Sequence, residues 1–157
     1  MTRAPFQVLV FPFRMMPDGK VLYAVFQRAT PTACWQGIAG GGEAGEPPLA
    51  AAKREAWEEA GVSQDNAYIE LSSCATIPVV QVCGFEWGYD VLVIPEHCFG
   101  VKVDHGELRL SPEHTSYKWL DYEAAIKILS WDSNKNALWE LNYRIERTTY
   151  QSHHDSK

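Results

Sequence analysis

The chain has 157 residues with a formal net charge of -6 at pH 7, and this acidic balance disfavours electrostatic binding to nucleic acid or to anionic lipid. Its residues are 46% hydrophobic and 22% charged, a composition typical of a folded protein rather than a disordered one. No stretch reaches the roughly 18 apolar residues of a membrane span, and the N-terminus lacks the apolar core of a secretory signal, so we expect a cytoplasmic protein.

The chain is expected to begin with strands. Segments 8–13 and 21–28 are rich in β-branched and aromatic residues and are separated by the turn sequence PDGK, so they are predicted to be neighbouring strands. The segment 30–42 follows, and its composition predicts a loop, a short strand and a glycine-rich loop.

The clearest predicted helix covers residues 49–60. Pro47 and Pro48 suit a first helical turn, where a missing N–H costs nothing, and Gly61 suits the position just after a helix. The residues between them are mostly strong helix formers.

The second half of the chain is expected to form further strands and then one or two helices. Segment 68–103 contains β-branched and aromatic residues interrupted by Pro and Gly, which predicts two to four strands. Segment 114–120 predicts one more strand. Segments 122–129 and 134–147 have the periodicity of helices.

One domain is expected over residues 1–150, because this length is too short for two comfortable cores. Residues 151–157 are predicted to form a polar, disordered tail. The cysteines match no paired C-x-x-C zinc pattern, so they are interpreted as buried or free thiols; they are Cys34, Cys74, Cys83 and Cys98.

The predicted helix carries an unusual concentration of acids. On a helical wheel, Glu55 and Glu59 project together, with Glu58 further round. Arg54 can pair with Glu58 at i+4, whereas the other two acids lack an obvious cationic partner. The acids lie beside a stripe of mostly small side chains on the same helix, formed by Leu49, Ala52, Ala56 and Ala60. This charge pattern fits either a solvated acidic face or a set of oxygen ligands for Mg²⁺ or Mn²⁺.

The order of residues from Gly40 to Val62 resembles the signature of the Nudix hydrolases, G-x5-E-x7-R-E-U-x-E-E-x-G-U, in which U is a bulky aliphatic residue. Every fixed letter is met. Ala56 occupies one U position and is smaller than usual, so we expect the helix to pack closely on its sheet. The resemblance implies an α/β (α+β) fold, an α/β/α sandwich with a mixed sheet, and hydrolysis of a nucleoside diphosphate linked to a further group.

The resemblance also implies roles for individual residues. It implies that Glu55, Glu58 and Glu59 hold a divalent metal, Mg²⁺ or alternatively Mn²⁺. Arg54 would orient a glutamate, and Glu46 would brace the loop or the arginine. The glycines at the end of the short strand, Gly40 and Gly41, would let the backbone approach the substrate phosphates.

The C-terminal half resembles a subset of the family, the dihydroneopterin triphosphate pyrophosphohydrolases and related dATP hydrolases. The resemblance lies in the sequences SPEHTSYKWLDYEAA and SWDSNKNALWEL. It implies a further metal ligand at Glu113 and substrate contacts at Arg28 and Ser133. A role for Glu113 as a simple turn acid remains an equal alternative.

Several aromatic and histidine residues leave two interpretations open. Trp35 can stack on a base or belong to the core. His114 can be a structural hydrogen-bonding residue or a base. If the segment GFEWGYD is extended, its three aromatic residues share one strand face, which suits a bound ring or a packed surface; they are Phe85, Trp87 and Tyr89.

The leading expectation is a metal-dependent pyrophosphohydrolase that cleaves a nucleoside or pterin triphosphate between its α and β phosphates. Alternative substrates are ADP-ribose, a dinucleoside polyphosphate or an oxidised dNTP. A nucleotide sensor without turnover is a third hypothesis, which the intact acids of the signature disfavour. We expect no nucleic acid or membrane partner, and either a monomer or a homodimer.

Overall fold

The structure, a computed structural model, describes residues 2–30 and 33–155. Its strands are β1 (Arg3–Met15), β2 (Val21–Arg28), β3 (Trp35–Gln36), β4 (Ile38–Glu43), β5 (Tyr68–Pro78), β6 (Val93–Lys102) and β7 (His114–Leu120). Its helices are α1 (Pro48–Ala60), α2 (Tyr122–Ile128) and α3 (Asp132–Asp155), with a 3-10 turn, η1, at Val79–Gln81. The predicted strands 8–13, 21–28 and 114–120 are confirmed within β1, β2 and β7.

The strands form a mixed sheet in which β1 is the central strand. The order is β3-β2-β1-β6-β5, with β4 also paired to β1 and β7 to β2. The β1–β6 pair is parallel and the other pairs are antiparallel. β1 bonds β4 as far as Val10 and bonds β2 only from Phe13 onward. Because β1 exchanges partners, the sheet divides between β4 and the β2–β3 pair.

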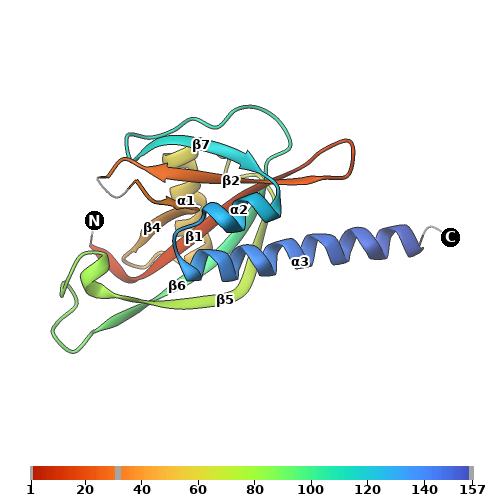
Figure 1. The fold of residues 1–157 in the computed structure, drawn as a ribbon. Coiled ribbons are helices and arrows are strands. Elements are labelled where there is room, and N and C mark those ends of the chain that lie inside the picture. The colour runs from red at the N-terminus through yellow and green to blue at the C-terminus, as the bar shows by residue number, and fades with distance from the viewer. Residues whose placement is uncertain (1, 31–32, 156–157) are drawn as a thin grey trace.

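Helices cover both faces of this sheet. Alternate residues of β1 face opposite sides: Val8 and Val10 belong to the core that contains the α1 alanines, whereas Leu9 and Phe11 belong to the core that contains α3. Figure 1 shows α1 behind the strands and α2 and α3 in front of them. The expected α/β/α sandwich with a mixed sheet is therefore confirmed.

Helix α1 begins and ends where the sequence predicts. Pro48 is its first residue, and Gly61 follows it in the left-handed conformation with φ 68° and ψ 22°, which glycine adopts without steric cost. The predicted small-residue stripe needs one correction, because Leu49 is 38% exposed. A wheel fixes the direction of a side chain but not whether the sheet extends beneath it. The buried alanines are Ala51, Ala52, Ala56 and Ala60.

Two segments differ from their predicted structure. The glycine-rich segment is not a loop but forms β4, because β1 pairs with it antiparallel, with one irregularity between Arg3 and Gln7. The segment GFEWGYD is not a strand but part of the connection between η1 and β6. There the Phe85 and Tyr89 rings contact each other, with their centroids 5.5 Å apart, and Trp87 Nε1 donates a hydrogen bond to the Arg3 carbonyl at 2.8 Å.

The C-terminal helix is longer than predicted. α3 continues to Asp155, beyond residue 151 where the polar tail is expected to begin, while 156–157 lie outside the described residues. Thr148, Thr149 and Ser152 each donate a side-chain hydrogen bond to the carbonyl four residues earlier, which suits hydroxyl side chains within a helix. The C-terminal half of α3 projects beyond the sheet (Figure 1).

The docking of α3 on the sheet predicts a large stability effect at Leu141. This side chain is fully buried, and it lies so close to β6 that a Cβ on Gly100 would be 2.5 Å from Leu141 Cδ1. We expect Leu141→Ala to lower the free energy of unfolding by about 3–5 kcal/mol, measured by urea denaturation. The exposed Leu49→Ala is the control, expected to cost less than about 1 kcal/mol. Equal losses in both variants would contradict this packing.

Candidate active site

Arg54 organises the N-terminal part of the candidate site. Its Nε and Nη2 donate to the two carboxylate oxygens of Glu46 at 2.9 and 3.0 Å. Nη1 donates to Glu55 Oε1 at 2.7 Å and to Glu58 Oε2 at 3.3 Å, and Nη2 also donates to the Gly41 carbonyl at 2.9 Å. The predicted pairing with Glu58 is present, but the expectation that Glu55 lacks a cationic partner is wrong.

This network also fixes the loop before α1. Glu46 Oε2 accepts a hydrogen bond from the Glu43 backbone N–H at 2.9 Å. The Arg54 guanidinium holds the pKa of Glu46 below its usual range, and the acids in turn raise the pKa of Arg54. Glu46 is therefore an ionised brace between the arginine and the loop.

Gly40 allows Glu55 to lie against β4. A Cβ at Gly40 would be 2.1 Å from Glu55 Cδ, so any larger residue would displace the acid. Glu55 is buried, and burial raises its pKa, while the hydrogen bond from Arg54 opposes this shift. The signature requires glycine at position 40 because the Glu55 carboxylate occupies the space that a side chain there would need.

Glu59 is the most deeply buried acid of α1, with 3% of its surface exposed. Its Oε2 lies 3.8 Å from His114 Nδ1, and neither atom has a hydrogen-bond partner among the described residues. Burial, together with the charges of Glu113 and Glu55, raises the pKa of Glu59 to about 10. Burial lowers the pKa of His114, so a neutral imidazole cannot neutralise the acid.

The acid cluster, formed by Glu55, Glu58, Glu59 and Glu113, has the properties of a cation site. In the described part of the chain, no three His, Cys, Asp or Glu side chains are already arranged around a common metal position. However, Glu59 has a buried oxygen without a hydrogen-bond partner within residues 2–30 and 33–155, and two further carboxylates raise its pKa. A divalent cation would remove that cost, and an all-oxygen donor set suits Mg²⁺ or Mn²⁺. The residues therefore fit a divalent metal.

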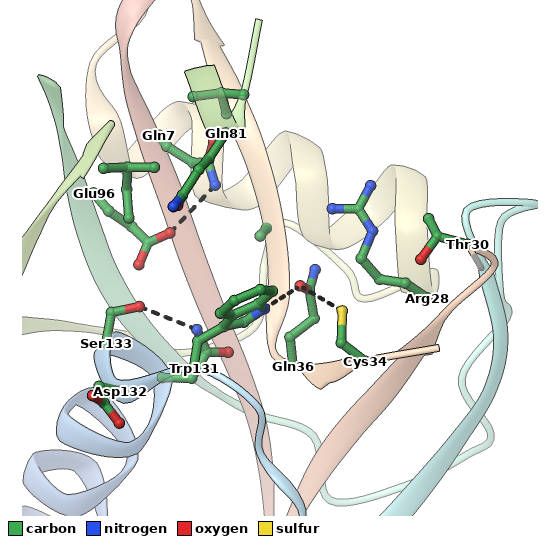
Figure 2. A pocket seen from close by; sticks show the side chains of 14 residues that line it. Gln7, Arg28, Thr30, Cys34, Gln36, Gln81, Glu96, Trp131, Asp132 and Ser133 are labelled. Carbon is green, nitrogen blue, oxygen red and sulfur yellow. Dashed lines mark hydrogen bonds between the residues drawn. The ribbon is translucent and has the colours of Figure 1, made fainter. Parts of the chain in front are cut away.

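A cavity of about 600 Å³ opens where the sheet divides. Figure 2 shows Gln7 and Glu96 on one side of it and Arg28 and Thr30 on the other, with Trp131 between them. The lining residues come from β1 to β6, η1 and the start of α3: Gln7, Arg28, Thr30, Cys34, Gln36, Ala39, Ile77, Gln81, Val82, Glu96, Trp131, Asp132, Ser133 and Asn134. A volume of this size suits a nucleoside-sized ligand.

Arg28 links the cavity to the acid cluster. It lines the cavity, and its backbone pairs with that of His114 on β7. Its charge contributes to the lowered pKa of His114. The Glu113 carbonyl accepts a hydrogen bond from the Ala29 N–H at 2.9 Å, so this part of the acid cluster is fixed directly beside the end of β2.

The structure brings some predicted substrate residues to the cavity and not others. Arg28 and Ser133 line it, whereas Gly40 and Gly41 lie in β4 beside Glu55 and Arg3. Trp35 is not among the lining residues; its ring packs in the α3-side core, with Lys118 Nζ 5.0 Å from its centroid. The aromatic residue of the cavity is instead Trp131.

Sequence reasoning missed the other polar residues of this cavity. Gln7 and Glu96 are side by side only because β1 and β6 pair in parallel, which no local pattern predicts. Trp131 lies within the sequence SWDSNKNALWEL, so the resemblance of that segment was a signal that could have identified it.

The NUDIX domain family model matches residues 5–140. The chain belongs to the Nudix family. As a Nudix hydrolase, it acts on phosphoric anhydride bonds, and members of this family generally use divalent metal ions. A comparison with curated proteins returned no match. In the described residues of this Nudix hydrolase, no helix is both long and apolar enough to cross a membrane.

Solved structures support the family assignment. A candidate NUDIX hydrolase from Listeria monocytogenes str. 4b F2365 is 37% identical, with 92% of this chain and 97% of that chain covered and a TM-score of 0.83. The E. coli dihydroneopterin triphosphate pyrophosphohydrolase is 23% identical, with coverages of 90% and 99% and a TM-score of 0.73. A C. elegans Ap4A hydrolase is 21% identical, with coverages of 91% and 98% and a TM-score of 0.71. The latter two similarities show the shared fold alone.

Proposed function

We propose that this Nudix hydrolase is a metal-dependent pyrophosphohydrolase that cleaves a nucleoside or pterin triphosphate between the α and β phosphates, releasing a monophosphate and pyrophosphate. The observation that carries the proposal is the cavity of about 600 Å³ that Arg28 joins to the acid cluster. Such an arrangement suits a ligand with a ring at one end and phosphates at the other.

The acids would hold the cation and the basic residues would hold the substrate. Mg²⁺, or alternatively Mn²⁺, would bind Glu55, Glu58, Glu59 and Glu113. When bound, the cation neutralises phosphate charge and lowers the pKa of water. Arg54 keeps Glu55 and Glu58 in place through its hydrogen bonds.

The substrate contacts follow from the same geometry. Arg28 would bind phosphate oxygens at the end of the cavity beside His114, and the hydroxyl of Ser133 would contact the nucleoside part. Gly40 keeps the backbone free of a side chain beside Glu55.

We further propose that residues 1–150 act as one domain, as a monomer or homodimer. A reducing cytoplasm suits its four free cysteines.

The test is product analysis by ³¹P NMR with a panel of dNTPs, NTPs, dihydroneopterin triphosphate, ADP-ribose and diadenosine polyphosphates, with and without Mg²⁺. We expect pyrophosphate and a monophosphate from triphosphates, only when metal is present. Hydrolysis of ADP-ribose or dinucleotides alone would overturn the proposed substrate class. Nucleotide binding without any product would support a sensor instead.

A further inference from the structure

The cavity contains a buried acid that belongs neither to the signature nor to the acid cluster. Glu96 lies on β6 with 3% of its surface exposed, and its side chain lines the cavity. Its Oε1 is buried and accepts no hydrogen bond from any residue that the structure describes. An unsatisfied carboxylate oxygen costs about 1–3 kcal/mol or more, so its retention at this position points to a ligand.

The other oxygen of Glu96 is held in place. Gln7, its neighbour across the parallel β1–β6 pair, donates from Nε2 to Glu96 Oε2 at 3.3 Å. Arg3 Nη2 donates to Gln7 Oε1 at 3.4 Å, which fixes the direction of the amide. Burial raises the pKa of Glu96, while the neighbouring Ser133 and Gln7 side chains oppose that rise. The network therefore orients an acceptor into the cavity.

The facing wall is also oriented. Trp131 Nε1 donates to Gln36 Oε1 at 3.2 Å, which directs the amide oxygen of Gln36 toward the indole and leaves its NH₂ group as a donor. Asn134 Oδ1 accepts from the Gly37 N–H at 2.8 Å, and its Nδ2 donates to Ser133 Oγ at 3.3 Å. The cavity therefore combines an aromatic ring, a carboxylate acceptor and an amide donor.

We propose that Glu96 selects a ring with a 2-amino-4-oxopyrimidine edge, as found in guanine and in pterins. This inference rests on the proposed function, since it names the ring of the same triphosphate. The edge presents two adjacent N–H donors, the ring N–H and the 2-amino group, to the carboxylate, and its oxo group is an acceptor for an amide such as that of Gln36.

The same geometry disfavours the other bases. Adenine and cytosine present a ring nitrogen acceptor beside their amino group, and uracil and thymine present a single N–H between two carbonyls. Each would place a lone pair against the carboxylate. Rejection of an unmatched polar edge is stronger than rejection by shape alone, because buried polar groups are left unpaired.

The test compares kcat/KM for dGTP and dITP, which differ only in the 2-amino group. We expect dGTP to be preferred by about 10- to 100-fold, the range for one hydrogen bond to a charged group. Glu96→Gln should reduce this ratio to within about 3-fold, because an amide cannot accept two N–H groups. Gln7 can still donate to the Gln oxygen, so the variant is expected to fold. Glu70→Gln, an exposed acid on neighbouring β5, is the matched control and should keep the wild-type ratio.

The two candidate sources of the edge are separated by comparing dGTP and GTP with dihydroneopterin triphosphate in the same assay. The substrate with the higher kcat/KM identifies the source. A wild-type ratio of dGTP to dITP near 1 would overturn the inference and leave the proposed hydrolysis standing, as would an unchanged ratio in Glu96→Gln.

A binding measurement separates this inference from the proposed function. Titration calorimetry with GMP, IMP and AMP needs no turnover. If no triphosphate is hydrolysed but GMP binds at least about 10-fold more tightly than IMP, and Glu96→Gln removes the difference, the proposed function fails and the ring selection holds. Equal affinities for the three monophosphates would overturn the ring selection.

Discussion

Glu59→Gln should lower the rate of triphosphate hydrolysis by at least about 10²-fold, the scale for losing a key electrostatic group. The amide has nearly the same shape as the acid, so the core around α1 is retained. However, it removes the group that can lose a proton to bind a cation, at a buried oxygen for which the described residues provide no hydrogen-bond partner. Steady-state kinetics with saturating Mg²⁺ measure the loss.

A second readout distinguishes loss of metal binding from general damage. Mn²⁺ should raise the thermal midpoint of the wild-type protein, because a ligand that binds the folded state stabilises it, and it should raise that of Glu59→Gln much less. Glu123→Gln, an exposed acid on α2, is the control and should behave as wild type in both assays. A Glu59→Gln variant with the wild-type rate would contradict the role of Glu59 in metal binding.

Arg54→Lys should be the second variant with a large effect, although it conserves charge. Arg54 donates to both oxygens of Glu46, to Glu55 and to the Gly41 carbonyl. A lysine ammonium is a single point that cannot reproduce this planar fork. We expect the free energy of unfolding to fall by about 2–3 kcal/mol and kcat to fall by at least about 10-fold. Urea denaturation and steady-state kinetics measure the two effects.

Arg144→Lys provides a matched control for that substitution. Arg144 pairs with Glu140 at 2.7 Å, but 43% of its side chain is exposed, so water replaces much of what the guanidinium provides. We expect a loss of less than about 1 kcal/mol and no change in kcat. If Arg54→Lys were equally mild, the arginine network would not be what holds the acids in place.

The signature region was predictable because its interactions are local. Pro48 and Gly61 set the ends of α1 through backbone geometry alone. Glu46 and Arg54 are eight residues apart, so a loop and two helical turns are enough to bring them together. The place of Gly40 also followed from the signature, although its physical reason, the close approach of Glu55, needed the pairing of β4 with β1.

The cavity was not predictable in the same way because its walls depend on distant pairings. Gln7 and Glu96 are separated by 89 positions, and only the β1–β6 register places them together. The sequence left Trp35 open between stacking on a base and packing in the core; strand alternation turns it away from Gln36, and its ring packs against the α3-side core. The glycine-rich segment likewise became a strand because a neighbour completes its hydrogen bonds.

The junction between the start of α3 and the β3–β4 turn has an evolutionary consequence. The Trp35 N–H donates to Ser130 Oγ at 3.1 Å, and the Gly37 N–H donates to Asn134 Oδ1 at 2.8 Å, although these partners are 95 and 97 positions apart. The wall of the cavity is thus inherited separately from the 23-letter motif that ends at Val62. Recombination that exchanges the C-terminal third would therefore retain every letter of that motif and still change the wall of the cavity, and with it the substrate specificity of the descendant.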